Sequence, residues 1–185
     1  MLDQFDLWVL AEVAEWRTPL LNVVFINLTA LGSTTLIALH TLVAFALLMA
    51  TKDKIGALQL VIASAGAETL TQLTKGFIER PRPTAIEPLV EAFGYSFPSG
   101  HAVSSAAMYV TIALLASRHL PLRRQRILLA VITVVIVVSV AMSRVYVGVH
   151  YFTDAVSGMV LGTAWAFILD AILKPRITQI TRMLC

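Results

Sequence analysis

Residues 127–147 read ILLAVITVVIVVSVAMSRVYV, and this stretch decides the fold. It has the length of about 20 apolar residues that a helix needs to cross the hydrocarbon core of a bilayer. Its charged residue, Arg144, lies near one end. Lipid offers the backbone no hydrogen-bond partners, so a chain that crosses it must be helical unless it closes a barrel. The stretch therefore predicts a membrane-spanning helix.

Four other apolar segments, each bounded by charge or turn residues, predict further spans. The chain is 58% hydrophobic and 14% charged, whereas soluble domains are about a quarter charged. We therefore expect an all-α, polytopic membrane helix bundle of about five transmembrane helices in a single domain over residues 1–185. The five predicted spans are 34–50, 55–77, 99–117, 127–147 and 152–173.

The N-terminal residues 1–33 are too polar or too short to span alone. Trp8 and Trp16 are typical of a membrane interface, and Gly32-Ser33 separates the apolar run 20–31 from the first span. We predict short interfacial or half-inserted helices here. The alternative is one tilted helix over 20–50. Residues 34–173 would form the transmembrane core and 174–185 a cytoplasmic tail.

The basic residues predict the orientation. Nine of the 14 Lys and Arg fall on one side of the five-span arrangement, and positive loops favour the cytoplasm. These nine are Lys52, Lys54, Arg118, Arg123, Arg124, Arg126, Lys174, Arg176 and Arg182. We expect a protein integral to the cell (inner or plasma) membrane, with the remaining polar clusters on the extracytoplasmic side.

The first of three polar clusters joins Lys75 to Arg82-Pro83. Lys75 is expected on the last turn of its span and Arg82 in the following loop, because Pro81 and Pro83 interrupt a helix. An ammonium and a forked guanidinium would then reach one small volume. A guanidinium suits phosphate because it can bond two oxygens at once.

The second cluster is Pro98-Ser99-Gly100-His101. Ser99-Gly100 is expected to open a helix, and helix N-termini attract anions through their unpaired N–H groups. The Ser99 hydroxyl can donate as well, and Gly100 allows a close backbone approach. His101 would lie on the first turn, within reach of the same anion.

The third cluster runs from Ser143-Arg144 to His150 and Asp154. Residues four apart share a helix face, so Asp154 can accept a hydrogen bond from Nδ1 of His150. That bond leaves Nε2 free to attack, and Arg144 can neutralise phosphoryl oxygens. Residue type alone does not decide whether His150 or His101 attacks, although the pairing with Asp154 favours His150.

Together the three clusters resemble the motifs of the type 2 phosphatidic acid phosphatase superfamily. The order of the blocks and every fixed position match over about residues 55–170. The matching residues are Lys75, Arg82, Pro83, Pro98, Ser99, Gly100, His101, Ser143, Arg144, His150 and Asp154.

This resemblance implies a phosphatase that needs no metal and no other cofactor. His150 would be the nucleophile that forms a phosphohistidine, Asp154 its orienting partner, and His101 the general acid. The phosphoryl oxygens would be bound by Lys75, Arg82, Ser99, Gly100 and Arg144. The sequence has no carboxylate-rich cluster, which argues against a two-metal mechanism.

A phosphate-cleaving site at a membrane surface predicts a lipid substrate. The candidates are a polyprenyl diphosphate, phosphatidylglycerophosphate, phosphatidic acid and lipid A phosphates. The alternatives are a phosphotransferase that passes the phosphoryl group to an alcohol and, less favoured, a protein that binds or transports lipid phosphate without chemistry. The five predicted spans argue against a soluble haloperoxidase. The expected partners are the lipid substrate and the bilayer, not nucleic acid, and the oligomeric state stays open.

Three further features lie outside the motifs. Glu68, inside the second span, is either a substrate or cation contact or a structural polar contact, and the structural interpretation is slightly favoured. Gly158 and Gly162 predict close helix packing within the bundle, and Asp170 could pair with Lys174. The loop 79–97 is expected to shape head-group access, with Phe93, Tyr95 and Phe97 as candidate lining residues.

Overall fold

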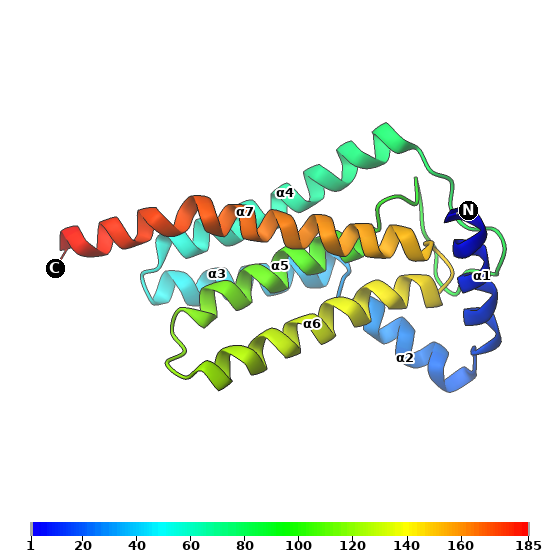
Figure 1. Cartoon of the computed structure of the whole chain (residues 1–185), viewed down its shortest axis with the longest axis horizontal. Coiled ribbons are helices and arrows are strands. Elements are labelled where there is room, and N and C mark those ends of the chain that lie inside the picture. The colour runs from blue at the N-terminus through cyan, green and yellow to red at the C-terminus, as the bar shows by residue number, and fades with distance from the viewer. Residues whose placement is uncertain (1, 185) are drawn as a thin grey trace.

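The computed structural model describes the backbone of residues 2–184 and the side chains of residues 3–173. Within that part the regular structure is entirely helical (Figure 1), which confirms the predicted all-α class. The helices are α1 (Leu2–Glu15), α2 (Pro19–Ala30), α3 (Thr34–Ala50), α4 (Lys54–Ile78), α5 (Gly100–Ser117), α6 (Arg123–Tyr146) and α7 (Phe152–Leu184).

Helices α3 to α7 correspond to the five predicted spans and pack side by side (Figure 1). By length and composition, α5, α6 and the first 22 residues of α7 can each cross a membrane. Helices α2 and α3 pass the same test only as one span that bends by 49°. The 25-residue α4 is long enough but less apolar, because it carries polar residues that include Gln59, Glu68 and Gln72.

Residues 20–50 form two helices, α2 and α3, rather than the single tilted helix that the sequence left open. Ser33 caps α3, since its hydroxyl accepts the N–H of Leu36 at 3.3 Å. Gly32 sits at the bend against α5 and α6. A Cβ there would lie 2.5 Å from Val140 Cγ1 and 3.1 Å from His101 Cβ, so only glycine allows this approach.

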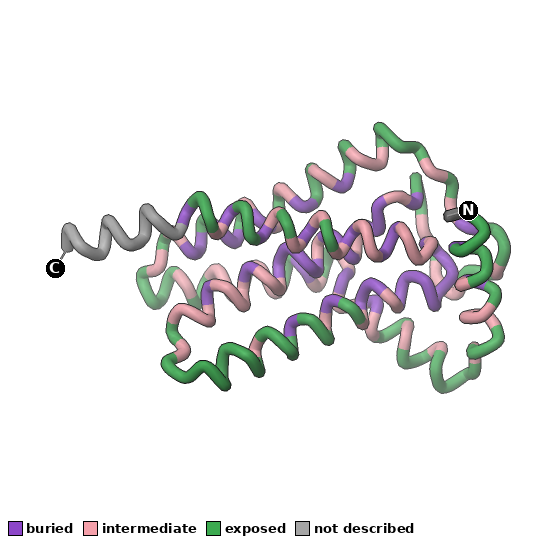
Figure 2. The backbone as a smooth tube through the Cα atoms, viewed as in Figure 1, coloured by how far each residue is buried: buried purple, intermediate pink, exposed green. Residues whose placement is uncertain are grey.

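The centre of the bundle is the contact between α5 and α7. A Cβ on Gly158 would meet the Ser99 carbonyl oxygen at 2.8 Å, and a Cβ on Gly162 would meet Ala106 Cβ at 2.9 Å. These glycines confirm the predicted packing face within the bundle. Figure 2 shows buried backbone gathered on α5 and at the adjoining ends of α6 and α7, whereas the first turns of α6 are exposed.

Helix α1 lies across one end of the bundle (Figure 1). Leu10 is fully buried against Ala141 and Val145 of α6 and Ala155 of α7. The short N-terminal helix therefore covers the end at which α6 stops and α7 starts.

At the opposite end of the bundle, an ion pair that the sequence did not predict joins the end of α5 to α7. Arg118, one of the nine basic residues predicted on the cytoplasmic side, lies 2.5 Å from Asp170 and also donates to Gln59 at 3.1 Å. The expected partner of Asp170, Lys174, and the rest of the tail 174–185 have side chains outside the described residues.

Candidate active site

The three sequence clusters come together at the end of the bundle that α1 covers. Lys75 lies in the last turn of α4, Arg82 in the loop 79–99 and Arg144 in the last turn of α6. His101 occupies the first turn of α5, close enough for the charges of Lys75, Arg82, Arg144 and His150 to act on its ring. The backbone N–H of Ser99 donates to the carbonyl of Asp154 at 3.1 Å, which ties the start of α5 to the start of α7.

The loop after α4 follows from local chemistry. Glu79 ends the helix in a left-handed conformation (φ 50°), and its N–H bonds to the Lys75 carbonyl at 2.9 Å. Pro81 then prevents the helix from continuing. Ser96 holds the returning limb, because its N–H donates to the Arg80 carbonyl and its hydroxyl to the Pro81 carbonyl. Arg82 is thereby placed in the loop, as predicted.

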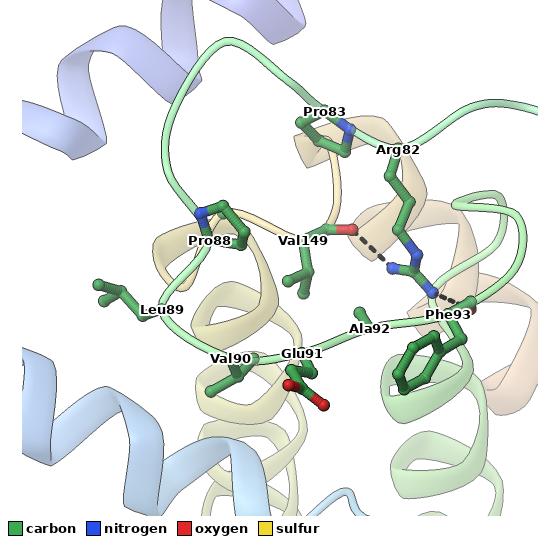
Figure 3. A pocket seen from close by; sticks show the side chains of 10 residues that line it. Arg82, Pro83, Pro88, Leu89, Val90, Glu91, Ala92, Phe93 and Val149 are labelled. Carbon is green, nitrogen blue, oxygen red and sulfur yellow. Dashed lines mark hydrogen bonds between the residues drawn. The ribbon is translucent and has the colours of Figure 1, made fainter.

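Arg82 links this loop to the nucleophile candidate. Its guanidinium donates to the carbonyls of Phe93 and Val149, each at 2.7 Å, as Figure 3 shows. The same Nη1 lies 3.3 Å from Nε2 of His150. Arginine can only donate, so Nε2 accepts and the ring proton is assigned to Nδ1.

His150 is held as a neutral base. Its side chain is 2% exposed, and burial, with smaller contributions from Arg144 and Arg82, lowers its pKa from 6.5 to about 4. Asp154 opposes this shift. Nδ1 of His150 faces Oδ2 of Asp154 at 3.5 Å, which is too long for a hydrogen bond, and this buried nitrogen makes none with the described residues.

Asp154 has a second partner that the sequence reasoning did not identify. Its Oδ1 accepts from Arg80 at 2.6 Å, and Arg80 reaches on to the buried carboxylate of Asp6 in α1 at 2.8 Å. Arg80 directly precedes Pro81 in the sequence and belongs to none of the three motifs. The sequence does show an acidic residue, Asp6, in the N-terminal helix. No local sequence pattern relates it to Arg80, which lies 74 positions away.

Several donors at the site are placed for an anion. The Lys75 ammonium donates to the Tyr95 carbonyl at 2.7 Å, and Arg144 Nη1 donates to the Thr29 hydroxyl at 2.7 Å. Among the described side chains, buried Arg144 Nε and Ser99 Oγ make no hydrogen bond. Buried donors of this kind need a partner, and phosphoryl oxygens fit them. The side chains of residues 3–173 form no group of three or more His, Cys, Asp or Glu suited to a metal ion.

A pocket of about 490 Å³ adjoins Arg82 (Figure 3). It is lined by the loop, including Glu91 and Phe93, and by Gly148 and Val149. Neither histidine lines it, and of the three aromatic residues proposed for head-group access only Phe93 does.

Glu68 makes its hydrogen bond within α4, although it is close enough for its charge to act on the Lys75 ammonium. Its carboxylate accepts from Gln72 at 2.6 Å on its own helix. It also lines an apolar groove of about 460 Å³ with residues of α3 and α4, among them Leu42 and Phe45. The structure therefore gives Glu68 a contact within its helix rather than one between helices.

Comparisons with known proteins agree with this geometry. Residues 56–177 match the family model described as the PAP2 superfamily. The chain is 36% identical to phosphatidylglycerophosphatase B of Bacillus subtilis over 155 residues, which are 83% of this chain and 75% of that protein. It is 32% identical over 118 residues to decaprenylphosphoryl-5-phosphoribose phosphatase of Mycobacterium tuberculosis, covering 60% of each.

A solved structure shares the whole arrangement. The crystal structure of a transmembrane PAP2-type phosphatidylglycerolphosphate phosphatase from Bacillus subtilis superposes with a TM-score of 0.87 at 31% sequence identity. The match covers 92% of this chain and 85% of that chain. The similarity thus extends beyond residues 56–177 toward the N-terminus.

Proposed function

Because the chain belongs to the PAP2 superfamily, we propose that it hydrolyses the phosphomonoester or diphosphate of a membrane lipid through a phosphohistidine intermediate. The reaction takes place on the extracytoplasmic side and needs no metal ion. The observation that carries this proposal is the neutral His150, whose Nε2 faces Arg82 while its Nδ1 faces Asp154.

The substrate class follows from the bundle and from the relatives. The site lies at the end of membrane-spanning helices, so a lipid can present its head group while its tail stays in the bilayer. Two relatives are named for a phosphatidyl and a prenyl phosphate. We therefore retain phosphatidylglycerophosphate, phosphatidic acid and a polyprenyl diphosphate as candidates, with phosphatidylglycerophosphate first.

In the first step, Nε2 of His150 attacks the phosphorus and the bond to the lipid oxygen breaks. His101, which takes up a proton when the anionic phosphate binds beside it, gives that proton to the leaving oxygen. The imidazole now carries a positive charge, which the Asp154 carboxylate stabilises from the Nδ1 side. Arg82, Lys75 and Arg144 hold the phosphoryl oxygens and offset the charge that develops on them.

In the second step, the phosphohistidine is hydrolysed. His101, now neutral, takes a proton from a water molecule whose oxygen bonds to phosphorus. The Nε2–P bond breaks, orthophosphate leaves, and both histidines return to their starting states. The donors Ser99 and Arg144, which lack partners in the described structure at Oγ and Nε, remain on the phosphate throughout.

The test is phosphate release by the detergent-purified protein from a panel of lipid monophosphates and diphosphates, with chelator present. We expect release to survive chelation and to fall by more than about 10³-fold in His150→Ala, as for other nucleophile deletions. Loss of activity with chelator would overturn the metal-free mechanism. If no lipid released phosphate but added alcohols became phosphorylated, the protein would be a phosphotransferase.

A further inference from the structure

The carboxylate of Asp6 is buried at the junction of α1, α7 and the catalytic loop. Its exposed fraction is 0%. Oδ1 accepts the backbone N–H of Thr153 at 3.0 Å, and Oδ2 accepts from Arg80 at 2.8 Å. Thr153 is the second residue of α7, where N–H groups lack partners within the helix. Asp6 therefore caps the helix that carries Asp154, from a different part of the chain.

Arg80 connects Asp6 to Asp154 through the two arms of one guanidinium. Nη2 donates to Oδ2 of Asp6. Nη1 donates to Asp154 Oδ1 at 2.6 Å and to the Thr153 hydroxyl at 2.8 Å. The guanidinium also lies over the Tyr151 ring, 4.0 Å from its centroid. Because the fork is planar and rigid, holding Nη2 sets the direction of Nη1.

The direction of Nη1 matters because the χ2 torsion of an aspartate has broad energy minima, so its carboxylate rotates easily unless a partner holds it. Asp154 Oδ1 is held by Arg80, and Oδ2 accepts the Tyr151 N–H at 3.0 Å while facing His150. If Oδ1 were released, the carboxylate could rotate and Oδ2 would leave Nδ1 of His150. The orientation of the nucleophile therefore depends on a chain of contacts that starts in α1.

We propose that Asp6 and Arg80 are positioning residues of the active site, with Asp6 holding the Asp154 carboxylate toward His150 through the Arg80 guanidinium. This inference rests on the proposed function, because it assigns a purpose to contacts around the proposed nucleophile. It extends the site to a helix that lies outside the family match at residues 56–177.

Asp3 supplies a matched control on the same helix. It also contacts Arg80 Nη2, but at 3.4 Å and with its side chain 89% exposed. A carboxylate in that setting is screened by water and holds the guanidinium weakly. Asp3→Asn removes the same charge from the same helix without touching α7.

The experiment measures kcat, KM and the stoichiometry of inorganic phosphate binding in the full-length purified protein. Asp6→Asn is expected to lower kcat by about 10- to 100-fold, the effect that outer partners of metal ligands have. KM and the phosphate stoichiometry should stay near wild type, because the cations that bind phosphate are intact. Asp3→Asn should change kcat less than about twofold.

A double-mutant cycle tests whether Asp6 acts through Arg80. In an Arg80→Gln background, adding Asp6→Asn should lower kcat less than about twofold further, because the connection is already cut. Additive losses would overturn the proposal. So would a fall in phosphate stoichiometry in step with kcat, since that result describes a partly unfolded protein.

Two further outcomes are distinguishable. If Asp6→Asn matches Asp3→Asn, the inference fails while the proposed function stands. If His150→Ala keeps wild-type phosphate release, the proposed function fails first. Should Asp6→Asn not yield folded protein, Asp6→Glu is compared with Asp3→Glu, and equal kcat in those two variants would also overturn the proposal.

Discussion

In the proposed mechanism, burial prepares the single residue His150 for nucleophilic attack. Burial, aided by Arg144 and Arg82, lowers the pKa of its imidazole to about 4, although Asp154 opposes the shift. A depressed histidine pKa means that the neutral, attacking form persists well below pH 6.5. The free site is therefore ready without first losing a proton.

The first prediction concerns the pH profile. The acid limb of kcat/KM reports ionisations of the free enzyme, so activity should fall as pH drops through about 4 rather than through 6.5. The measurement is kcat/KM from pH 3.5 to 8, with the ionisation of the substrate titrated separately. A limb centred on pH 6.5 that the substrate does not explain would contradict this assignment.

Arg144 gives the second prediction. Its buried Nη1 donates to the Thr29 hydroxyl at 2.7 Å, a contact between α6 and α2. Thr29→Val keeps the shape but leaves that donor unpaired, which costs about 1–3 kcal/mol. We expect kcat/KM to fall roughly 10-fold and the melting temperature to drop.

Thr133→Val is the control for that substitution. Thr133 is also buried on the bundle, but its hydroxyl donates to the Leu129 carbonyl within its own helix at 2.8 Å. Its loss should leave kcat/KM near wild type. Equal losses of activity in the two variants would show that Thr29 has no particular role in holding Arg144.

Among the elements, the α5–α7 contact sets the spacing of the site, because both helices begin at it. Gly158 and Gly162 allow their backbones to approach so closely that a Cβ would collide with the facing helix. The Ser99 N–H then reaches the Asp154 carbonyl. His101 and Asp154, on the first turns of these helices, owe their relative position to glycines further along α7.

The third prediction tests this contact. Gly162→Ala should destabilise the protein by about 1–3 kcal/mol through overpacking, which would lower the melting temperature by several degrees. Gly76→Ala in α4 meets nothing within 4 Å and should leave the melting temperature unchanged or slightly raised. The comparison is made by thermal unfolding in one detergent. An unchanged Gly162→Ala would mean that the helices can separate freely.

At the scale of single helices, the sequence predicts most of the boundaries. Apolar runs bounded by charge predict α3 to α5 within about one residue of their observed ends. Helix α6 begins at Arg123 rather than residue 127, because its basic first turn is helical although it is not apolar. The division into α2 and α3 could not be decided, since Gly32 is explained only by its contacts with Val140 and His101 on other helices.

For the whole molecule, the bundle has two chemically different ends. One end gathers the catalytic clusters under α1, and the other holds the turns that carry Lys52, Lys54 and Arg123. By the positive-inside tendency, we expect the second end in the cytoplasm. The active site would then open on the outer face of the membrane.

The fourth prediction is that labelling of single cysteines will report this orientation. In a Cys185→Ser background, Phe93→Cys lies in the catalytic loop and Leu122→Cys at the opposite end, where the native side chains are 83% and 43% exposed. An impermeant maleimide on intact cells should label the first and reach the second only after permeabilisation. The reverse pattern would place the active site in the cytoplasm.

The candidate site was predictable only where its residues belong to a local pattern. Lys75, His101 and His150 were predicted as site residues because each belongs to a motif with fixed spacing in the sequence. The structure brings the three side chains close together. Asp6 and Thr29 were not predicted, although each contacts an arginine at the candidate site. Their partners lie 74 and 115 positions away, and spacing on one helix carries no information about contacts at that separation.

The bond between Asp6 and Thr153 joins residues 147 positions apart, which has a consequence for synthesis. Asp6 is synthesised before its partner on α7, which follows only after α2 to α6 have been translated. The first helix can therefore complete its contact with α7 only after the helices between them have been synthesised. Under the proposed mechanism, Asp6 can help to position Asp154 beside His150 only after the first turn of α7 has been synthesised, so we expect no lipid hydrolysis before that point.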